Sequence, residues 1–262
     1  MERHSKNSYR KHIMFCIIVP IKNQFKIVKM CIESIVKYYA DQEIVLIDDG
    51  STEQNLVSYL KETHKRFNCN WQLFTNQSST GHTKACELGI KNSTSENIFL
   101  LNSDTILTKN SLEFLSDTLD KNKNIAVVGP KTSSASGPQL SLEAFTNRFK
   151  WTIDEIEEYA RQNELLNNEI LDIELVNGFC LGLKRSVFYQ VGKFDENLTC
   201  YGNEKELLLR IRKAGYRTVF ITKSYVHHFG KMSYSQEKNI NIGKAQRDAD
   251  CYIMKKHLST GK

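Results

Sequence analysis

The stretch Ile98-Phe99-Leu100-Leu101-Asn102-Ser103-Asp104-Thr105 decides how the rest of the chain is interpreted. Its first four residues are all apolar, which is typical of a strand buried on both faces of a sheet. An amide, a hydroxyl and a carboxylate follow where that strand should end. Ligands of open α/β sheets bind beyond the carboxyl ends of the strands, and a carboxylate there suits a hard cation such as Mg²⁺ or Mn²⁺. The alternative is a polar turn in which Asp104 or Thr105 caps the next helix.

Strands and helices are expected to alternate on both sides of this stretch. From residue 13 to residue 129, short apolar runs are separated by segments whose apolar residues recur at helical spacing. This alternation predicts a mostly parallel, doubly wound α/β sheet. The expected strands are 15–20, 43–47, 70–74, 98–101 and 125–129, and the expected helices are 25–39, 56–67, 82–92 and 111–119, the last capped by Ser111.

The second half of the chain is expected to hold less regular elements. Residues 131–141 form a small polar loop, and 175–183 is a glycine-punctuated strand where another group approaches the backbone closely. The tail 235–262 is predicted to be helical, basic and peripheral. The remaining expected elements are helices at 153–167, 185–191 and 204–213 and a strand at 218–221.

Length and composition are those of a globular protein. A chain of 262 residues, 40% hydrophobic and 25% charged, suffices for one large α/β domain or for one domain with a small appendage. It holds no run of about 18 apolar residues, so no membrane-spanning helix is expected. The seven cysteines form no CxxC pair, which favours reduced, buried thiols and a cytoplasmic location over a disulfide framework or a zinc site.

The net charge is +6, with basic residues frequent near both ends and a loose basic tail expected at 1–12. Such a balance suits nucleic acid, an anionic membrane surface or a nucleotide-diphosphate substrate. The chain carries no aromatic-and-basic RNA-binding signature and no helix-turn-helix, so a nucleic-acid partner is not expected.

Two further motifs lie at expected strand ends or helix starts. Asp48 and Asp49 can accept hydrogen bonds from a base N–H or a ribose hydroxyl, although Asp49 could equally hold Gly50 and Ser51 in an Asx turn. Residues 81–84, Gly-His-Thr-Lys, open a helix whose free N–H groups, with Lys84, could meet phosphate oxygens. The motif lacks Walker spacing, and a plain helix start is the alternative.

A set of short motifs, in order along residues 13–234, resembles the family 2 glycosyltransferases. Each motif alone is weakly specific, whereas the ordered set is specific. The resemblance implies the GT-A fold, in which an α/β sheet binds a nucleotide sugar. The motifs are Cys16-Ile17-Ile18-Val19-Pro20, Ile47-Asp48-Asp49-Gly50-Ser51-Thr52, residues 81–90, Leu100-Leu101-Asn102-Ser103-Asp104-Thr105, Val176-Asn177-Gly178-Phe179-Cys180, Gly192-Lys193-Phe194-Asp195-Glu196, Leu209-Arg210-Ile211-Arg212-Lys213-Ala214-Gly215-Tyr216 and His228-Phe229-Gly230.

The resemblance also implies an organisation and an activity. The GT-A domain would span 13–234, with a nucleotide-sugar-binding half at 13–130, an acceptor or catalytic half at 131–234 and a basic helical extension at 235–262. The implied reaction is an inverting, metal-dependent transfer from a nucleotide-diphosphate sugar, with a UDP-sugar favoured, to a hydroxyl of a glycan, a lipid-linked saccharide or a protein. A lipid-linked acceptor would require peripheral membrane association, and a partner glycosyltransferase or a homo-oligomer is left open.

Positions that match the family's motifs would take over the family's roles. Asp48 and Asp49 would hold the uracil and ribose of the donor. Asp104 stands at the end of the family's DxD and would bind the Mn²⁺ or Mg²⁺ that bridges the diphosphate. His228, rather than His227, would be a further ligand unless it only packs at a strand end. The implied donor-binding residues are Pro20, Asp48, Asp49, Lys84, Asn102 and Ser103.

The catalytic base is expected at the start of the helix that contains Arg210. In the family's pattern of acids, Asn203 stands at the first position, Glu204 at the base and Glu206 at the last. Glu206 lies four residues before Arg210, so a helical salt bridge is its simplest role. Glu204 is nearer the helix start, where the dipole favours a charged carboxylate. Glu204 is therefore the expected base and Glu206 the alternative.

Some positions depart from the family pattern. Cys86 and Glu87 stand where the family has Arg and Asn, which leaves Lys84 as the stand-in for donor contact. Together with Asn203, these departures favour, as the alternative function, a catalytically impaired relative that acts as a binding or scaffold partner. A nucleotidyltransferase would need a glycine-rich basic loop after the first strand, and residues 20–24 contain no glycine.

Overall fold

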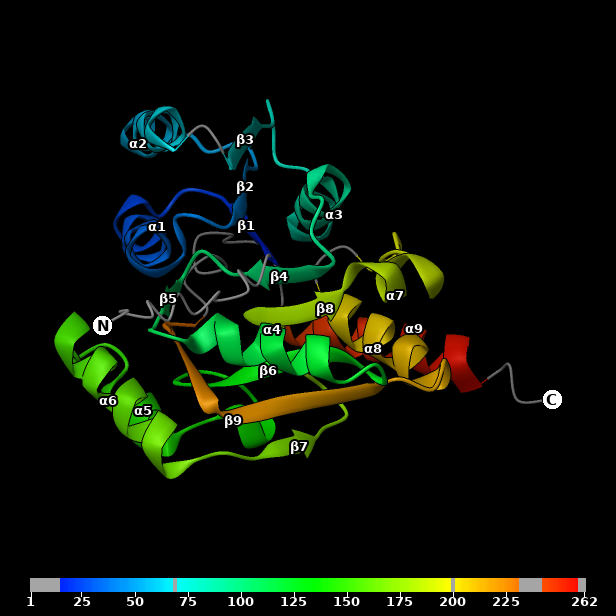
Figure 1. Ribbon diagram of the computed structural model, residues 1–262. Helices are drawn as coiled ribbons and strands as arrows, with labels where there is room; N and C mark the ends of the chain where they lie inside the picture. The colour runs from blue at the N-terminus through cyan, green and yellow to red at the C-terminus, as the bar shows by residue number, and fades with distance from the viewer. Residues whose placement is uncertain (1–14, 68–69, 199–200, 231–241, 259–262) are drawn as a thin grey trace, which may run out of the picture.

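The structure is a computed structural model that describes residues 15–67, 70–198, 201–230 and 242–258. Within these residues the chain forms one sheet of nine strands in the order β3-β2-β1-β4-β8-β6-β9-β5, with β7 also paired to β9. Helices cover both faces of this sheet (Figure 1). The predicted α/β architecture is therefore confirmed.

The first half of the sheet is parallel, as the alternation of strands and helices predicts. β3, β2, β1 and β4 pair in parallel, and the helices between them return the chain to the same edge. Helices α1 and α3 have the predicted bounds. The elements of this half are β1 (Phe15–Ile21), α1 (Phe25–Tyr39), β2 (Glu43–Asp48), α2 (Gln54–Arg66), β3 (Trp71–Thr75), α3 (His82–Asn92) and β4 (Asn97–Leu101).

The second half makes the sheet mixed rather than mostly parallel. β8 runs antiparallel to both of its neighbours, β4 and β6, and both β5 and β7 run antiparallel to β9. β6 and β9 are parallel. The elements are β5 (Thr105–Leu107), α4 (Ser111–Lys121), β6 (Ile125–Thr132), the 3-10 turn η1 (Gly137–Gln139), α5 (Leu142–Asn147), α6 (Ile153–Leu166), β7 (Ile170–Asp172), β8 (Cys180–Lys184), α7 (Arg185–Gln190), α8 (Asn203–Lys213), β9 (Arg217–His228) and α9 (Ile242–Leu258).

Several local predictions were wrong. Residues 103–104 form a turn between β4 and β5, as the polar-turn alternative expects, but Thr105 begins the short strand β5 and does not cap a helix. Ser111 is the first residue of α4 rather than its cap, and its hydroxyl donates to the Thr108 carbonyl. The strand expected at 218–221 extends to His228, because β6, β7 and β5 all pair along it.

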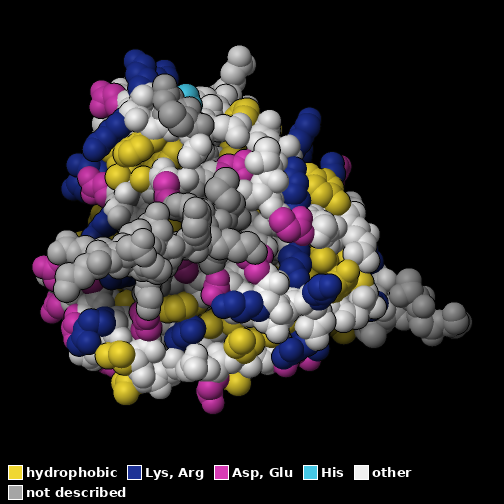
Figure 2. All heavy atoms as spheres, in the orientation of Figure 1, with side chains coloured by type: hydrophobic (Ala, Val, Ile, Leu, Met, Phe, Trp, Pro, Cys, Tyr) yellow, Lys and Arg dark blue, Asp and Glu magenta, His cyan; other side chains and the backbone are white. Residues whose placement is uncertain are grey.

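The C-terminal helix α9 is basic and helical, as predicted, but it is not peripheral. Ala249 and Ile253 are buried against Leu198, and in Figure 1 α9 lies beside α8. The predicted tail at 1–12 lies outside the described residues. Figure 2 shows basic and acidic side chains interspersed over the face in view, so the net charge of +6 does not form a single basic patch there.

The cysteine prediction is confirmed for four of the five cysteines that the structure describes. Cys16, Cys31, Cys86 and Cys180 are buried free thiols, and burial raises the pKa of each. Cys251 on α9 is free but exposed. Cys69 and Cys200 lie outside the described residues.

The two faces of the sheet bury separate apolar clusters, as the two-residue period of a strand requires. In β1, Ile17 and Val19 belong to the cluster beneath α1, α2 and α4, whereas Cys16 and Ile18 belong to the cluster beneath α3, α7 and α8. α3 approaches β1 so closely that a methyl group on Gly89 would lie 2.2 Å from Ile18 Cγ2.

This close approach generates a prediction about stability. We expect Gly89→Ala to destabilise the protein by about 1–2 kcal/mol in urea unfolding, because overpacking at a buried strand outweighs the gain in helix propensity. Lys91→Ala, at an exposed position of the same helix, is the control and should change the free energy of unfolding by less than about 0.5 kcal/mol. A Gly89→Ala protein as stable as the control would contradict the close contact.

Candidate functional site

Three polar segments converge on one edge of the sheet, beyond the carboxyl ends of its parallel strands. Asp48 ends β2, and residues 102–104 follow β4. The third segment is distant in sequence, because β5 pairs antiparallel with β9 and places Thr105 opposite His228. The Phe229 amide then donates to the Asp104 carbonyl over 3.0 Å. Asp104 and His228 are adjacent as a result.

His228 is held so that one ring nitrogen faces Asp104. Its Nδ1 lies 2.6 Å from the Ser134 carbonyl oxygen, which can only accept, so Nδ1 carries the proton. The ring also stacks on Phe179, with the ring centres 5.0 Å apart. Nε2 then lies 3.2 Å from Asp104 Oδ1, and both side chains are largely buried. The backbone thus orients the imidazole and directs its second nitrogen toward the carboxylate.

The Asp104–His228 pair fits a divalent cation in its donor chemistry. A carboxylate oxygen and an imidazole nitrogen both suit Mn²⁺, and an Nδ1–H bonded to a carbonyl is the usual support of a metal-binding histidine. In the part of the chain that the structure describes, no group of three or more His, Cys, Asp or Glu forms a metal cluster. Asp104 and His228 could bind such a cation together with oxygen atoms of a bound molecule or of water.

His227 points away from Asp104 and is a packing residue. Its Nε2 lies 2.9 Å from the Arg148 carbonyl oxygen and its Nδ1 lies 3.0 Å from the Tyr225 hydroxyl. The side chain is fully buried, and burial lowers its pKa to about 4. Because both ring nitrogens have partners, His228 is the histidine available to a ligand at this edge.

Asp49 holds the loop between β3 and α3. Its carboxylate accepts hydrogen bonds of 2.7–2.9 Å from Asn76, Ser79, Thr80 and Gly81, including the backbone N–H groups of the last two. These hydrogen bonds lower its pKa to about 2 against the effect of burial. The loop 76–81 is therefore tied to the end of β2 by one side chain.

The turn after β2 is held by Asp48 rather than by Asp49, through an amide three residues on instead of the two of an Asx turn. Asp48 Oδ1 accepts from the Ser51 amide over 2.9 Å, and the residue is buried. Gly50 has φ +73°, and a methyl group there would lie 2.8 Å from the Ser78 carbonyl carbon, so the turn requires glycine. Both carboxylates thus have structural partners within the chain.

The other predicted donor-binding residues lie around the same edge. Pro20 is two residues beyond Ile18, the last β1 residue that pairs with β4, so its missing N–H interrupts no ladder on that side. The Asn102 backbone is fixed by hydrogen bonds to Phe179 and Thr105, and Ser103 is buried. Lys84 is exposed in the first turn of α3.

A small pocket between α3 and α8 contains the predicted base. Glu204 is partly exposed, and within the described residues its carboxylate makes no hydrogen bond or ion pair. The carboxylate covers the backbone of Gly178, where a methyl group would lie 2.4 Å from Glu204 Oε1. This confirms the close approach predicted for the glycine-punctuated segment. The lining residues are His82, Thr83, Cys86, Leu100, Gly178, Leu181, Phe194, Asn203 and Glu204.

The departures from the family pattern lie in or beside this pocket. Asn203 Nδ2 donates to the Thr83 hydroxyl, whereas its buried Oδ1 has no hydrogen-bond partner among the described residues. Cys86 Sγ lies 3.5 Å from His82 Nε2. Glu87 accepts a hydrogen bond from the Phe194 amide. Sequence reasoning missed the Thr83–Asn203 and Glu87–Phe194 contacts, because each joins segments more than 100 residues apart.

Glu206 makes the helical salt bridge that its spacing predicts. Its carboxylate is fully buried and lies 2.6 Å from the Arg210 guanidinium. Glu206 does not line the pocket, whereas Glu204 does. Of the two carboxylates considered as base, only Glu204 has a carboxylate in contact with this cavity.

Comparisons with known proteins find a family model and curated relatives that match this chain. Residues 16–192 match the model of a family described as glycosyl transferase family 2. The chain is 26% identical over 196 residues to the probable N-acetylgalactosaminyltransferase 9 of Caenorhabditis elegans, which is 71% of this chain and 34% of that relative. It therefore spans about a third of the length of this curated relative. Glu204 and His228 lie beyond the part that the family model matches.

Two solved structures are similar to this one. GalNAc-T7, solved with UDP, GalNAc and Mn²⁺, has a TM-score of 0.63 at 18% identity over 82% of this chain and 43% of its own. The mannosyltransferase PcManGT from Pyrobaculum calidifontis, solved with GDP-Man and Mn²⁺, has a TM-score of 0.65 at 16% identity over 95% of this chain and 65% of its own. At these identities the likeness shows the fold, which is GT-A. None of the helices described is long and apolar enough to cross a membrane.

The bonding of Asp49 predicts how stability depends on pH. Because its pKa is about 2 in the folded state and 3.8 when unperturbed, its stabilising effect is complete above about pH 5 and is lost as the pH falls toward 2. We expect Asp49→Asn to lower the free energy of unfolding by about 2 kcal/mol at pH 7, and the difference from wild type to shrink toward pH 2. Chemical unfolding between pH 2 and 7 measures this. For Asp154→Asn, at an exposed position on α6, the free energy of unfolding should depend on pH as it does in wild type. The same pH dependence for Asp49→Asn would refute the stabilising role assigned to Asp49.

Proposed function

The chain belongs to glycosyl transferase family 2, and from this membership we propose that it transfers a sugar from a nucleotide-diphosphate donor to an acceptor hydroxyl with inversion at the anomeric carbon. The proposed donor is a UDP-sugar, and the acceptor belongs to a glycan, a lipid-linked saccharide or a protein. The observation that carries the proposal is the Asp104–His228 pair, with its carboxylate and imidazole 3.2 Å apart at the carboxyl edge of the sheet.

Donor binding is assigned to the ends of β1, β2 and β4. The end of β2 would receive the nucleoside, with Asp48 beside the base and ribose and with Asp49 holding the loop 76–81 next to them. Residues 102–104, Pro20 and Lys84 would surround the diphosphate. Asp104 and His228 would hold the divalent cation. When bound, that cation would offset the negative charge that develops on the leaving diphosphate.

Glu204 is the proposed catalytic base. An acceptor hydroxyl is a weak nucleophile at neutral pH, so its proton must pass to a base as its oxygen attacks the anomeric carbon. The oxygen–carbon bond forms while the carbon–oxygen bond to the diphosphate breaks, the proton goes to Glu204, and the electron pair leaves with the nucleoside diphosphate. Glu204 suits this role because its carboxylate is partly exposed and lines the pocket. Glu206 does not suit it, because Arg210 neutralises it in a buried site.

The alternative is a catalytically impaired relative that binds a nucleotide sugar without transferring the sugar. The buried Asn203 Oδ1 favours it, because Asn203 replaces an acid of the family pattern and has no hydrogen-bond partner among the described residues. Binding and turnover must therefore be measured separately.

A panel of UDP-, GDP- and dTDP-sugars, each with Mn²⁺ or with a chelator, tests the function. We expect release of one nucleotide that requires the metal. Asp104→Ala should abolish metal-dependent binding, and Glu204→Gln should lower kcat by about 10²–10⁴-fold with donor affinity changed less than twofold. Glu62→Gln, exposed on α2, is the matched control. Tight binding without turnover on any acceptor would favour the alternative, and no binding at all would refute both.

The contact between Glu204 and Gly178 gives a second test. A methyl group at position 178 would lie 2.4 Å from Glu204 Oε1 and 2.9 Å from its Cδ, so the carboxylate must move. We expect Gly178→Ala to lower kcat by about 10–100-fold, because a catalytic group displaced by even about 1 Å loses much of its effect. The shorter carboxylate of Glu204→Asp should fit beside the new methyl group, so the double variant should be more active than Gly178→Ala alone. If the losses of kcat in the two single variants simply add in the double variant, the proposed contact between Gly178 and the Glu204 base would be contradicted.

A further inference from the structure

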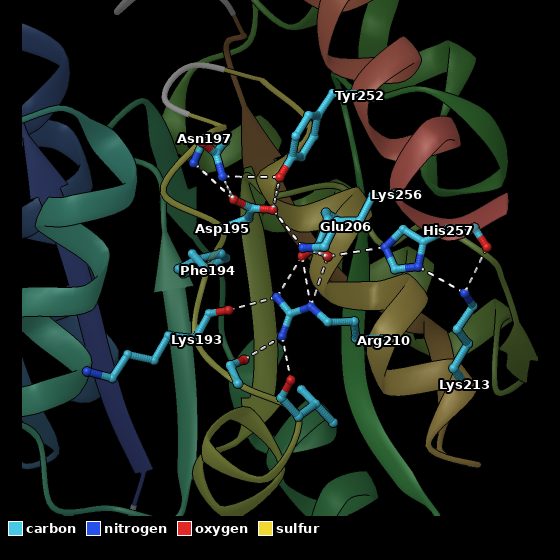
Figure 3. Close-up of polar contacts among 12 residues, drawn as sticks. Lys193, Phe194, Asp195, Asn197, Glu206, Arg210, Lys213, Tyr252, Lys256 and His257 are labelled. Atoms are coloured by element: carbon cyan, nitrogen blue, oxygen red, sulfur yellow. Dashed lines mark hydrogen bonds and ion pairs between the residues drawn. The ribbon is translucent and has the colours of Figure 1, made fainter. Parts of the chain in front are cut away.

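A cluster of charged side chains joins α9 to the segments around the Glu204 pocket (Figure 3). Its centre is Glu206 of α8, whose side chain is fully buried. Arg210 donates to both Glu206 oxygens. From α9, Lys256 Nζ lies 2.7 Å and His257 Nε2 lies 3.2 Å from Glu206 Oε1. Three basic side chains therefore converge on one carboxylate, two of them from α9.

Arg210 connects this carboxylate to the segment before Phe194. Its guanidinium donates to the carbonyl oxygens of Val191, Gly192 and Lys193 over 2.6–2.7 Å. Three consecutive carbonyls bound to one planar group leave the backbone little freedom. Phe194 follows them directly and lines the pocket with Glu204.

Lys256 connects the same carboxylate to the segment after Phe194. Its Nζ lies 2.7 Å from Asp195 Oδ2, and the Tyr252 hydroxyl donates to that oxygen over 2.9 Å. The Asp195 carboxylate is 7% exposed, so it needs these partners. Figure 3 shows Lys256 between Asp195 and Glu206. Phe194 is thus fixed by Arg210 on one side and by α9 on the other.

α9 also contacts the residue that precedes Asn203 and Glu204. Gly202 has φ +84°, and a methyl group there would lie 3.0 Å from Ile253 Cδ1 and 3.1 Å from Ala249 Cβ. The beginning of α8 therefore fits closely against the apolar face of α9. This packing is independent of the ion pairs and constrains the same turn that carries Glu204.

We propose that α9 clamps the candidate catalytic pocket, and that Lys256 and Tyr252 are positioning residues that act through Asp195 and Glu206 on Phe194 and Glu204. The catalytic part of this inference rests on the proposed role of Glu204 as base. Loss of the Lys256 ammonium would leave two largely buried carboxylates with fewer partners, and the segment 191–198 would then lose one of its two anchors.

Hydrogen–deuterium exchange tests the clamp without any need for turnover. We expect Lys256→Met, which keeps the aliphatic stem but loses the charge, to raise the exchange rate of the peptide covering 191–198 by about threefold or more. Lys256→Arg keeps both the stem and the charge, so its exchange rate should return toward that of wild type. Asp250→Asn is the matched control, since it breaks the exposed Lys205–Asp250 ion pair between the same two helices. Exchange in 191–198 that is the same in Lys256→Met and the control would overturn the clamp.

Steady-state kinetics then test the catalytic consequence. We expect Lys256→Met to lower kcat by about 10–100-fold with donor KM changed less than twofold, and Lys256→Arg to recover most of the loss. Tyr252→Phe, which removes one hydroxyl, should also raise exchange and lower kcat, but by less than Lys256→Met does. It is the variant to use if Lys256→Met does not fold. Unchanged kcat alongside faster exchange would refute the positioning role. If wild type transfers no sugar, the proposed function fails, while the exchange result still decides the clamp.

Discussion

The antiparallel pairing of β5 with β9 is the constraint on which the candidate site depends. It joins a three-residue strand from the middle of the chain to the end of a twelve-residue strand near its C-terminus. This register brings Asp104 beside His228, and the Ser134 carbonyl then orients the imidazole. β6 and β7 hold β9 along its length, so the position of His228 is set by backbone ladders rather than by loops.

The parallel half of the sheet was predictable because each of its strands and helices is marked by a pattern within its own sequence. Apolar runs in β1, β2 and β4 and the helical spacing in α1 and α3 identify elements without knowledge of their neighbours. The mixed half was not predictable in the same way. β8 lies between β4 and β6 although it follows β6 in the chain, and periodicity does not encode sheet order. The extension of β9 also depends on partners that are distant in sequence.

Within the site, the sequence motifs showed which residues lie there better than they showed which residues contact one another. Asp104 and His228 were named through resemblance, and the structure brings them together. The helical spacing of Glu206 and Arg210 correctly predicted an ion pair. Neither pattern nor resemblance indicated that Asp49 would bind the loop 76–81, or that Lys256 would join Asp195 to Glu206. Such contacts form between segments with no periodic relation, and a basic helix near a terminus looks peripheral when only its composition is known.

The hydrogen bonds of Asp49 also bear on the entropy of ligand binding. Five donors from the loop 76–81 satisfy its carboxylate from within the chain. A molecule that settles against the end of β2 therefore meets a surface that folding has organised in advance. The conformational entropy of that loop is lost when the protein folds, so it is not lost again each time a ligand binds. Preorganisation of this kind lets a small number of polar contacts yield useful affinity.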